Sequence, residues 1–191
     1  MTLRLNVIVA STRPGRVGIS VGRWFEGFAR EDGRFDVHLV DLAEIDLPIY
    51  DEPRHPRLAQ YEHEHTRRWS AIVDAADAYV LVTPEYNFGP TPALVNALNY
   101  VYNEWCYKPA GFVSYGGISG GLRAAQAIKM TMSAMKLVPL PEAVTIPMVA
   151  QQVENGVFTP KQPQVEGGKA MLAELERWAT ALRLLREGRT G

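Results

Sequence analysis

Cysteine is almost absent from this 191-residue chain, which contains only Cys106. A single cysteine excludes an intramolecular disulfide and any zinc site built from several cysteines, and it fits a reducing compartment. Long apolar runs are also missing, since none approaches the roughly 20 residues that a transmembrane helix needs. The short run Leu5 to Ala10 meets polar residues at Ser11, so we interpret it as a first strand rather than a signal peptide. We therefore expect a cytoplasmic protein.

An excess of charge of either sign is likewise absent, because 20 lysines and arginines balance 21 aspartates and glutamates to a net charge of −1. This balance argues against nucleic acid or a membrane as a partner. We interpret the histidines at positions 55, 63 and 65 as solvated surface and expect no metal site. The rest is ordinary for a globular protein, with 47% apolar and 21% charged residues, and we expect a single domain over 1–191.

Short apolar runs alternate with longer segments of helical periodicity along most of the chain. Residues 3–10 are nearly continuous in apolar side chains, as in a strand buried on both faces of a parallel sheet. Between such runs, apolar residues recur every three to four positions, which is typical of amphipathic helices. The expected strands are 3–10, 35–42, 78–82, 109–115 and 143–149, and the expected helices end near residue 30 or cover 69–76, 94–101, 122–135 and 171–185.

This alternation predicts an α/β fold with a doubly wound, five-stranded parallel sheet and helices on both faces. Right-handed crossovers and short loops favour the flavodoxin-like strand order 2-1-3-4-5. The segment 150–163 is polar and broken by prolines, and it is either an extra hairpin or a loop. In such a sheet the loops after strands one, three and four meet at one edge, where ligands bind.

The loop after the third expected strand reads T-P-E-Y-N-F-G-P-T and spans 83–91. Pro84 breaks the strand, Gly89 and Pro90 allow a second bend, and Thr91 can cap a helix that has proline at its first position. Residues 86–88 should therefore lie on a tight loop at the carboxyl end of a strand. This loop is either a ligand-binding loop or an ordinary surface turn.

The loop after the first strand, 11–20, offers hydroxyls, two guanidinium groups and the free N–H groups of a helix start, without an acidic residue. A helix amino terminus suits a phosphate, and Arg13 and Arg16 can add charge-assisted hydrogen bonds. The dinucleotide fingerprint G-x-G-x-x-G and the G-K-[ST] ending of a triphosphate site are both absent, which favours a monophosphate such as that of FMN. The alternative is a polar loop with solvated arginines.

The loop after the fourth strand, 114–121, reads S-Y-G-G-I-S-G-G. Missing side chains would let its backbone N–H groups approach a flat ligand closely, although plain turn chemistry explains the glycines equally well. The stretch 99–107, N-Y-V-Y-N-E-W-C-Y, is dense in aromatics and is either core or a contact between subunits. Within it we expect Cys106 to behave as a small buried apolar residue.

Taken together, A-S-T-R-P-G-R-V-G at 10–18, T-P-E-Y-N at 83–87 and Y-G-G-I-S-G-G at 115–121 resemble the NADPH-dependent FMN reductase family. This family of flavodoxin-like oxidoreductases includes quinone, azo-dye and chromate reductases. The resemblance covers residues 3 to about 149, and P-E-Y-N is its most specific part. The chain departs from many members at the start of the first helix, where Val17 and Gly18 offer only backbone N–H groups in place of a Ser or Asn pair.

The resemblance implies that the first loop holds the phosphate of FMN, with Arg16 as the candidate for the missing side chains. It implies that P-E-Y-N lies along the isoalloxazine ring and that the glycine loop faces the ring's other edge. The cofactor-binding residues so implied are Ser11, Arg13, Arg16, Val17, Gly18, Ser20, Pro84, Glu85, Tyr86, Asn87, Ser114, Gly116, Gly117 and Ser119.

The resemblance also implies an FMN-dependent NAD(P)H oxidoreductase that works by two-step hydride transfer. NADPH or NADH is the donor, and the acceptor is quinone-like or another small molecule, such as a flavin, an azo dye or a metal oxyanion. The cofactor carries the chemistry, so we expect no catalytic residue. Since family members usually pair, a homodimer or homotetramer is implied. The alternatives are a non-catalytic FMN carrier or redox sensor, and a flavin-free protein that binds another phosphorylated ligand.

Overall fold

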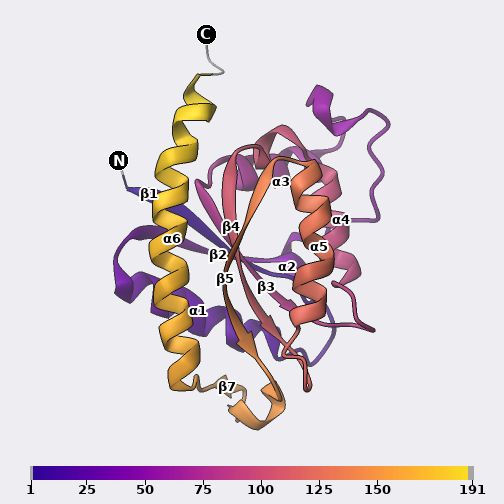
Figure 1. Ribbon diagram of the computed structural model, residues 1–191. Helices are drawn as coiled ribbons and strands as arrows, with labels where there is room; N and C mark the ends of the chain where they lie inside the picture. Colours follow the sequence, from indigo (N-terminus) through magenta and orange to yellow (C-terminus); the bar gives the residue numbers. More distant parts are fainter. Residues whose placement is uncertain (1, 189–191) are drawn as a thin grey trace.

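A five-stranded parallel sheet forms the centre of the computed structural model, which describes residues 2–188 (Figure 1). The strands stand in the order β2-β1-β3-β4-β5, so the flavodoxin-like fold predicted from the sequence is confirmed. Because β2 and β3 lie on opposite sides of β1, the strand order reverses there, and doubly wound sheets bind ligands at such a point. The bounds are Leu3–Val9 for β1, Phe35–Asp41 for β2, Ala78–Pro84 for β3, Lys108–Tyr115 for β4 and Leu137–Ile146 for β5.

The inner strands are apolar because both of their faces are covered. Every residue of β3 and β4 is buried, which accounts for their near-continuous apolar runs. The predicted bounds 143–149 were wrong for β5, which begins at Leu137 and ends at Ile146. Pro139 and Pro141 argue against a strand in its first half. Proline is nevertheless tolerated in β5, because this strand lies at the edge of the sheet and pairs only with β4.

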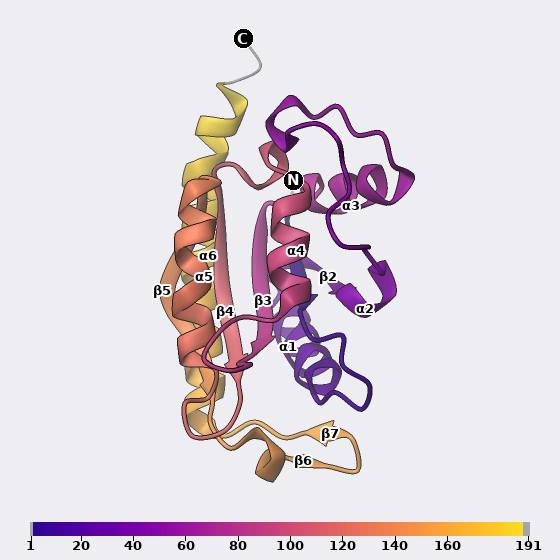
Figure 2. The same ribbon diagram turned by 90° about the vertical axis from the view of Figure 1, so that its right-hand side faces the viewer.

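Helices cover both faces of the sheet, as predicted (Figure 2). On one face lie α1 (Gly18–Asp32) and α6 (Gln162–Glu187), and on the other lie α3 (Glu64–Asp74), α4 (Pro92–Tyr100) and α5 (Leu122–Ala134). The connections hold a short helix, α2 (Leu42–Ile45), and single 3-10 turns at Pro56–Leu58, Asn103–Trp105 and Val149–Gln152. Over residues 2–188, no helix has the length and apolar character that crossing a membrane requires.

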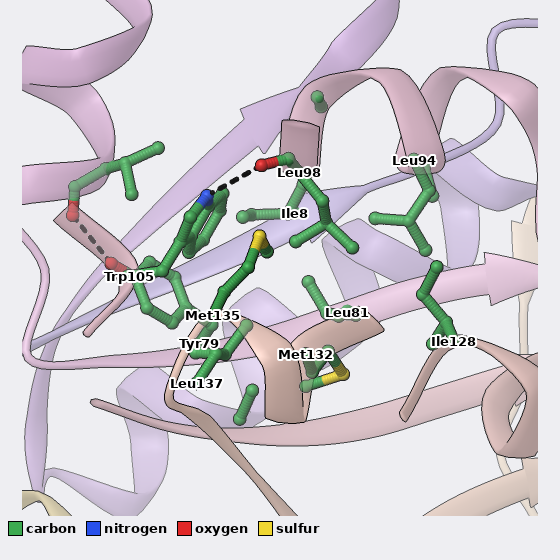
Figure 3. Packing of buried hydrophobic residues seen from close by; sticks show 14 of the residues in the cluster. Ile8, Tyr79, Leu81, Leu94, Leu98, Trp105, Ile128, Met132, Met135 and Leu137 are labelled. Atoms are coloured by element: carbon green, nitrogen blue, oxygen red, sulfur yellow. Dashed lines mark hydrogen bonds between the residues drawn. The ribbon is translucent and has the colours of Figure 1, made fainter. Parts of the chain in front are cut away.

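Large rings fill the core between the sheet and α3, α4 and α5 (Figure 3). The Trp105 ring packs edge-on against Tyr79, with ring centroids 4.8 Å apart, and its indole N–H donates to a main-chain carbonyl of α4 at 3.2 Å. Tyr100, Trp105 and Cys106 are all buried within this chain. These three side chains are therefore core and are not available to a second subunit, whereas Asn99 and Asn103 are exposed and Tyr102 and Tyr107 are half-buried. A subunit contact through the exposed part of 99–107 stays a prediction.

The segment after β5 contains a small antiparallel hairpin, β6 (Val153–Glu154) and β7 (Val157–Phe158), so the hairpin reading of 150–163 is confirmed. The turn residues Asn155 and Gly156 have φ of 50° and 79°, as a two-residue hairpin turn requires. The Phe158 ring packs on a tryptophan of α1 with centroids 5.0 Å apart. This contact fixes the hairpin beside α1, beyond the carboxyl end of β5 (Figure 2).

Candidate functional site

Three loops meet at the carboxyl edge of the sheet, after β1, β3 and β4. These strands are neighbours, so the loops that follow them are neighbours as well. The Ser11 hydroxyl lies 3.1 Å from the phenol oxygen of Tyr86 and joins the first loop to the second. The Ser119 hydroxyl donates to the Glu85 carboxylate at 2.8 Å and joins the third loop to the second. Residues from three distant segments of the sequence are thus brought together.

The first loop leads into the amino terminus of α1. Val17 is its N-cap residue, no side chain caps the helix, and no acidic residue lies in the first turn. The first N–H groups of the helix are therefore free for an anion, which the helix dipole also favours. Arg13 is exposed on the loop, whereas Ser11 is 2% exposed. Ser20 donates its hydroxyl back to the Val17 carbonyl at 2.8 Å.

Arg16 is held by a protein carboxylate. Its guanidinium forms an ion pair with Asp41 at the end of β2, and only 17% of the Arg16 side chain is exposed. The second oxygen of Asp41 accepts from the Ala43 N–H at 3.0 Å and caps α2. No local sequence pattern indicates this pair, whose members are 25 positions apart. The charge of Arg16 is therefore already paired within the protein, and Arg16 should attract an anion less strongly than Arg13 does.

The second loop is a two-residue hairpin. Tyr86 and Gly89 exchange both backbone hydrogen bonds at 2.9 Å, and the residues between them, Asn87 and Phe88, have φ of 48° and 68°. Asparagine tolerates this left-handed conformation, whereas phenylalanine rarely adopts it, and strain of this kind concentrates at functional sites. Phe88 is 67% exposed at the tip of the loop. The tight loop expected from the sequence is confirmed.

Thr91 anchors the far end of the second loop. Its hydroxyl oxygen accepts from the Leu94 N–H at 3.1 Å and caps α4, as the sequence predicted. The same hydroxyl donates to the Ala10 carbonyl at 2.9 Å. The second loop is therefore fixed to the end of β1, beside the first loop.

Glu85 points toward the third loop. Its side chain is 7% exposed and accepts hydrogen bonds from Ser119 and from two groups of Arg123, the guanidinium Nε at 2.6 Å and the backbone N–H at 3.2 Å. Burial alone would raise the pKa of Glu85, but the hydrogen bonds from Arg123 and Ser119 outweigh burial and lower it. The Arg123 guanidinium also lies 3.9 Å from the centre of the Phe88 ring. Glu85 thus fastens the second loop to the third.

The third loop depends on two of its glycines. Gly120 and Gly121 have φ of 60° and 82°, and a Cβ on Gly121 would lie 2.6 Å from the Tyr115 backbone nitrogen. Gly117, by contrast, has no atom within 4 Å of such a Cβ, so space is open in front of it. The carbonyls of Gly116 and Gly117 accept from the backbone after β5, at 3.1 Å and 2.8 Å.

Ser114 and Pro84 lie deeper than the other candidates. Ser114 is 1% exposed within β4, and its Cβ would be 2.9 Å from a Cβ on Gly121. Pro84 is the buried last residue of β3 and pairs with Tyr115. Both residues therefore lie beneath the surface that the three loops form.

Tyr115, the last residue of β4, was not among the sequence candidates. Its side chain is 3% exposed, and its phenol oxygen is buried without a hydrogen-bond partner among residues 2–188. A Cβ on Gly18 would lie 2.2 Å from that oxygen and 3.3 Å from the Ser11 Cβ, so the phenol lies under the start of α1 and beside Ser11. Burial raises the pKa of Tyr115, so the phenol stays protonated and can donate.

The residues present fit FMN. The uncapped start of α1 and the exposed Arg13 suit a phosphate, and the buried phenol of Tyr115 is a donor that still lacks an acceptor. At the third loop, the open space at Gly117 leaves room for a flat ring. The site thus offers an anion-binding end and a flat end on neighbouring loops.

The fold and the site define a flavodoxin-like protein suited to a flat, phosphorylated ligand. Comparison with known families gives the particular group: residues 3–151 match the family model of NADPH-dependent FMN reductase, and the chain belongs to this family. The family predicted from the three sequence motifs is therefore confirmed.

Individual relatives agree with this assignment. The chain is 35% identical over 163 residues to an NAD(P)H-dependent FMN reductase of Schizosaccharomyces pombe, a match that covers 84% of this chain and 80% of the relative. It is 31% identical over 145 residues to a quinone reductase of Pseudomonas putida, with 72% and 74% covered. Among solved structures it is similar to the flavoenzyme NAD(P)H:(acceptor) oxidoreductase FerB of Paracoccus denitrificans, with a TM-score of 0.72, 24% identity, and 94% and 98% of the chains covered, which supports the fold.

Family membership makes the chain an oxidoreductase that uses FMN as cofactor and NAD(P)H as electron donor. The predictions of an enzyme and of these cofactors are thereby confirmed. The assignment of individual residues to the cofactor stays a prediction.

Proposed function

We propose that this chain is an FMN-dependent reductase of quinone-like or other small acceptors, such as flavins, azo dyes or metal oxyanions. Bound FMN would supply two successive hydride transfers, the first from NADPH or NADH and the second to the acceptor. The observation that supports this best is the union of three loops at the point where the strand order reverses, through the Ser11–Tyr86 and Glu85–Ser119 contacts.

The first loop would hold the phosphate. Arg13 contributes a full positive charge at the surface, and the backbone N–H groups of Val17 and Gly18 belong to the uncapped helix start. Ser11 and Ser20 supply hydroxyls at the same end. Arg16 acts chiefly through its ion pair with Asp41, which fixes the loop.

The second and third loops would hold the ring. Tyr86 and Asn87 lie on the hairpin beside it, with Pro84 and Ser114 supporting the loops from below. Glu85 and Ser119 keep the two loops in register through their hydrogen bond. The Gly116 N–H already donates to the Ile146 carbonyl at 3.2 Å, so other backbone N–H groups of the third loop, such as that of Gly117, would stabilise negative charge that develops on the ring, as the donors of an oxyanion hole do.

The surface of these loops suits a flat, apolar acceptor. Phe88 on the second loop and Ile118 on the third are 67% and 89% exposed, and exposed apolar side chains of this size at a binding site favour contact with an aromatic molecule. A quinone has this character, and one of the relatives is named a quinone reductase. We expect Phe88 and Ile118 to contact the acceptor or the donor, and we expect their replacement to leave the affinity for FMN unchanged.

As part of the same proposal, the chain is one domain, lies in the cytoplasm and assembles as a homodimer or homotetramer, without nucleic acid or membrane as a partner. A groove of about 1300 Å³ lies beside the second loop, between segment 47–57, α4 and the end of α5. Ile49 lines it and is 90% exposed, which favours burial against a second copy. Light scattering should then give a multiple of 21.3 kDa, and a mass of 21.3 kDa would refute the assembly.

The test of the function is a single anaerobic experiment. Purified protein is loaded with FMN, freed of excess cofactor and mixed with NADPH or NADH while the visible spectrum is recorded. The flavin bands should bleach within seconds and return on addition of a benzoquinone. Bands that stay oxidised with both donors would contradict the proposal and favour a carrier or sensor of FMN.

A further inference from the structure

The phenol of Tyr115 is the polar group at this site for which the proposed function gives no role. Its oxygen is buried and has no hydrogen-bond partner among residues 2–188. A buried hydroxyl without a partner is unfavourable, and native structures seldom keep one without a reason. Gly18 makes room for this phenol, since any Cβ there would lie 2.2 Å from its oxygen. The close approach of the phenol to the start of α1 is therefore built into the backbone.

Ser11 is a neighbour of this phenol, since the same Cβ on Gly18 would lie 3.3 Å from the Ser11 Cβ. Ser11 is 2% exposed, and its oxygen lies 3.1 Å from a second phenol, that of Tyr86. A serine hydroxyl has one proton to donate and two lone pairs that accept. When both phenols donate to Ser11, its lone pairs are filled, and its own proton has to go to a third group.

We infer that Tyr115 is a positioning residue for the phosphate: when an anion binds at the start of α1, Tyr115 and Tyr86 both donate to the Ser11 oxygen, and the Ser11 proton is thereby directed toward the anion. This inference rests on the proposed function and adds how that site recognises its ligand. The anion completes the arrangement, because α1 has no side-chain cap and no acidic residue in its first turn. The group recognised is a phosphate monoester, whatever ring it carries.

Tyr115→Phe separates this role from a role in holding the ring. FMN affinity should fall about five- to tenfold, as for the loss of one hydrogen bond, while riboflavin, which lacks the phosphate, should bind as it does to the wild type. In a Ser11→Ala background the same substitution should cause no further loss. An unchanged FMN affinity, an equal loss for both ligands, or a loss that adds fully to that of Ser11→Ala would each overturn the inference.

The stability of the protein without FMN gives a second readout. Without an anion the phenol has no hydrogen-bond partner, so Tyr115→Phe should leave the Tm of the FMN-free protein unchanged or raise it by about 2–4 °C. The matched control is Tyr79→Phe, since the buried Tyr79 phenol donates to the Val73 carbonyl at 2.7 Å, and this variant should lower the Tm. A fall in Tm with Tyr115→Phe as large as in the control would contradict the inference.

The proposed function can fail separately. Wild-type protein that binds inorganic phosphate but not FMN would refute the FMN reductase, and the inference would then be tested by the phosphate affinity of Tyr115→Phe, which should fall. Wild-type protein that binds neither ligand would overturn both. FMN bound equally well by the wild type and Tyr115→Phe would overturn the inference alone.

Discussion

Replacing Glu85 by glutamine should loosen the contact between the second and third loops. The carboxylate accepts from the Ser119 hydroxyl and from the Nε and backbone N–H of Arg123, at 2.6–3.2 Å. A glutamine side chain keeps one acceptor oxygen but places an amide NH₂ where the other oxygen was, so it meets the Arg123 donors with a donor. The expected result is a less stable protein and weaker FMN binding.

The magnitude follows from burial. Hydrogen bonds to charged groups contribute about 1.5–3 kcal/mol, and losing one partner of a buried pair costs more. Glu85 is 7% exposed, but the Arg123 side chain is 47% exposed, so water replaces part of what is lost. We expect Glu85→Gln to lower the free energy of unfolding by about 1–3 kcal/mol.

The assay is urea unfolding of the protein without FMN, followed by FMN titration of each variant. Glu174→Gln is the matched control, because Glu174 pairs with Arg177 on the outside of α6 at 2.6 Å and should contribute less than about 0.5 kcal/mol. The pKa of Glu85 is lowered in the folded state, so its stabilisation is present above the ordinary carboxyl pKa and is lost as the pH falls through the lowered value. Stability and FMN affinity equal to wild type at pH 7 would refute the reasoning.

Three further predictions concern the phosphate end, the glycine loop and the core. Arg13→Ala should weaken FMN by about 1–2 kcal/mol and leave riboflavin unchanged in parallel titrations, and an equal FMN affinity would contradict the phosphate assignment. Gly120→Ala should lower the free energy of unfolding in urea by at least about 1–2 kcal/mol, because φ is 60° and the new Cβ would lie 2.9 Å from the Pro147 nitrogen. Gly117→Ala should leave the free energy of unfolding nearly unchanged and lower only the affinity for FMN. Burial lowers the pKa of Lys108 to about 8, so the folded state binds fewer protons than the unfolded state between pH 8 and about 10.4. The free energy of unfolding should therefore rise with pH in this range relative to that of Lys108→Met, by no more than about 3 kcal/mol. A difference between the two proteins that does not change with pH would contradict this.

Much of the fold was predictable because the inner strands have a clear pattern in the sequence. β3 and β4 are buried at every residue, and burial on both faces demands the apolar runs that the sequence shows. The first half of β5 was missed for the opposite reason, since Pro139 and Pro141 are tolerated only because no strand pairs on its outer side. That information lies in the sheet and not in the local sequence.

The loops of the site were predictable, whereas their internal contacts were not. Pro84, Gly89 and Thr91 mark the second loop by local turn and capping chemistry, and local chemistry can be read from a sequence. Glu85 meets Arg123 across 38 positions, and Arg16 meets Asp41 across 25. No local pattern selects these partners, because the strand order and not the spacing brings them together.

Tyr115 shows a third kind of limit. In the motif Y-G-G the glycines indicate a ligand-binding loop, whereas nothing in the local sequence indicates a role for the tyrosine. Its buried phenol becomes a candidate only when Gly18, 97 positions earlier, is seen to make room for it. A buried polar group without a hydrogen-bond partner can be recognised only in the folded structure.

The central claim is that the three loops form a site for FMN that recognises its phosphate. Its most direct test is the ratio of the Kd for riboflavin to the Kd for FMN, measured by fluorescence titration of the wild-type protein at low salt. Summing the helix start, Arg13 and Ser11 as about 3 kcal/mol, we predict that FMN binds about 100-fold more tightly. Equal affinities for the two flavins would contradict the account.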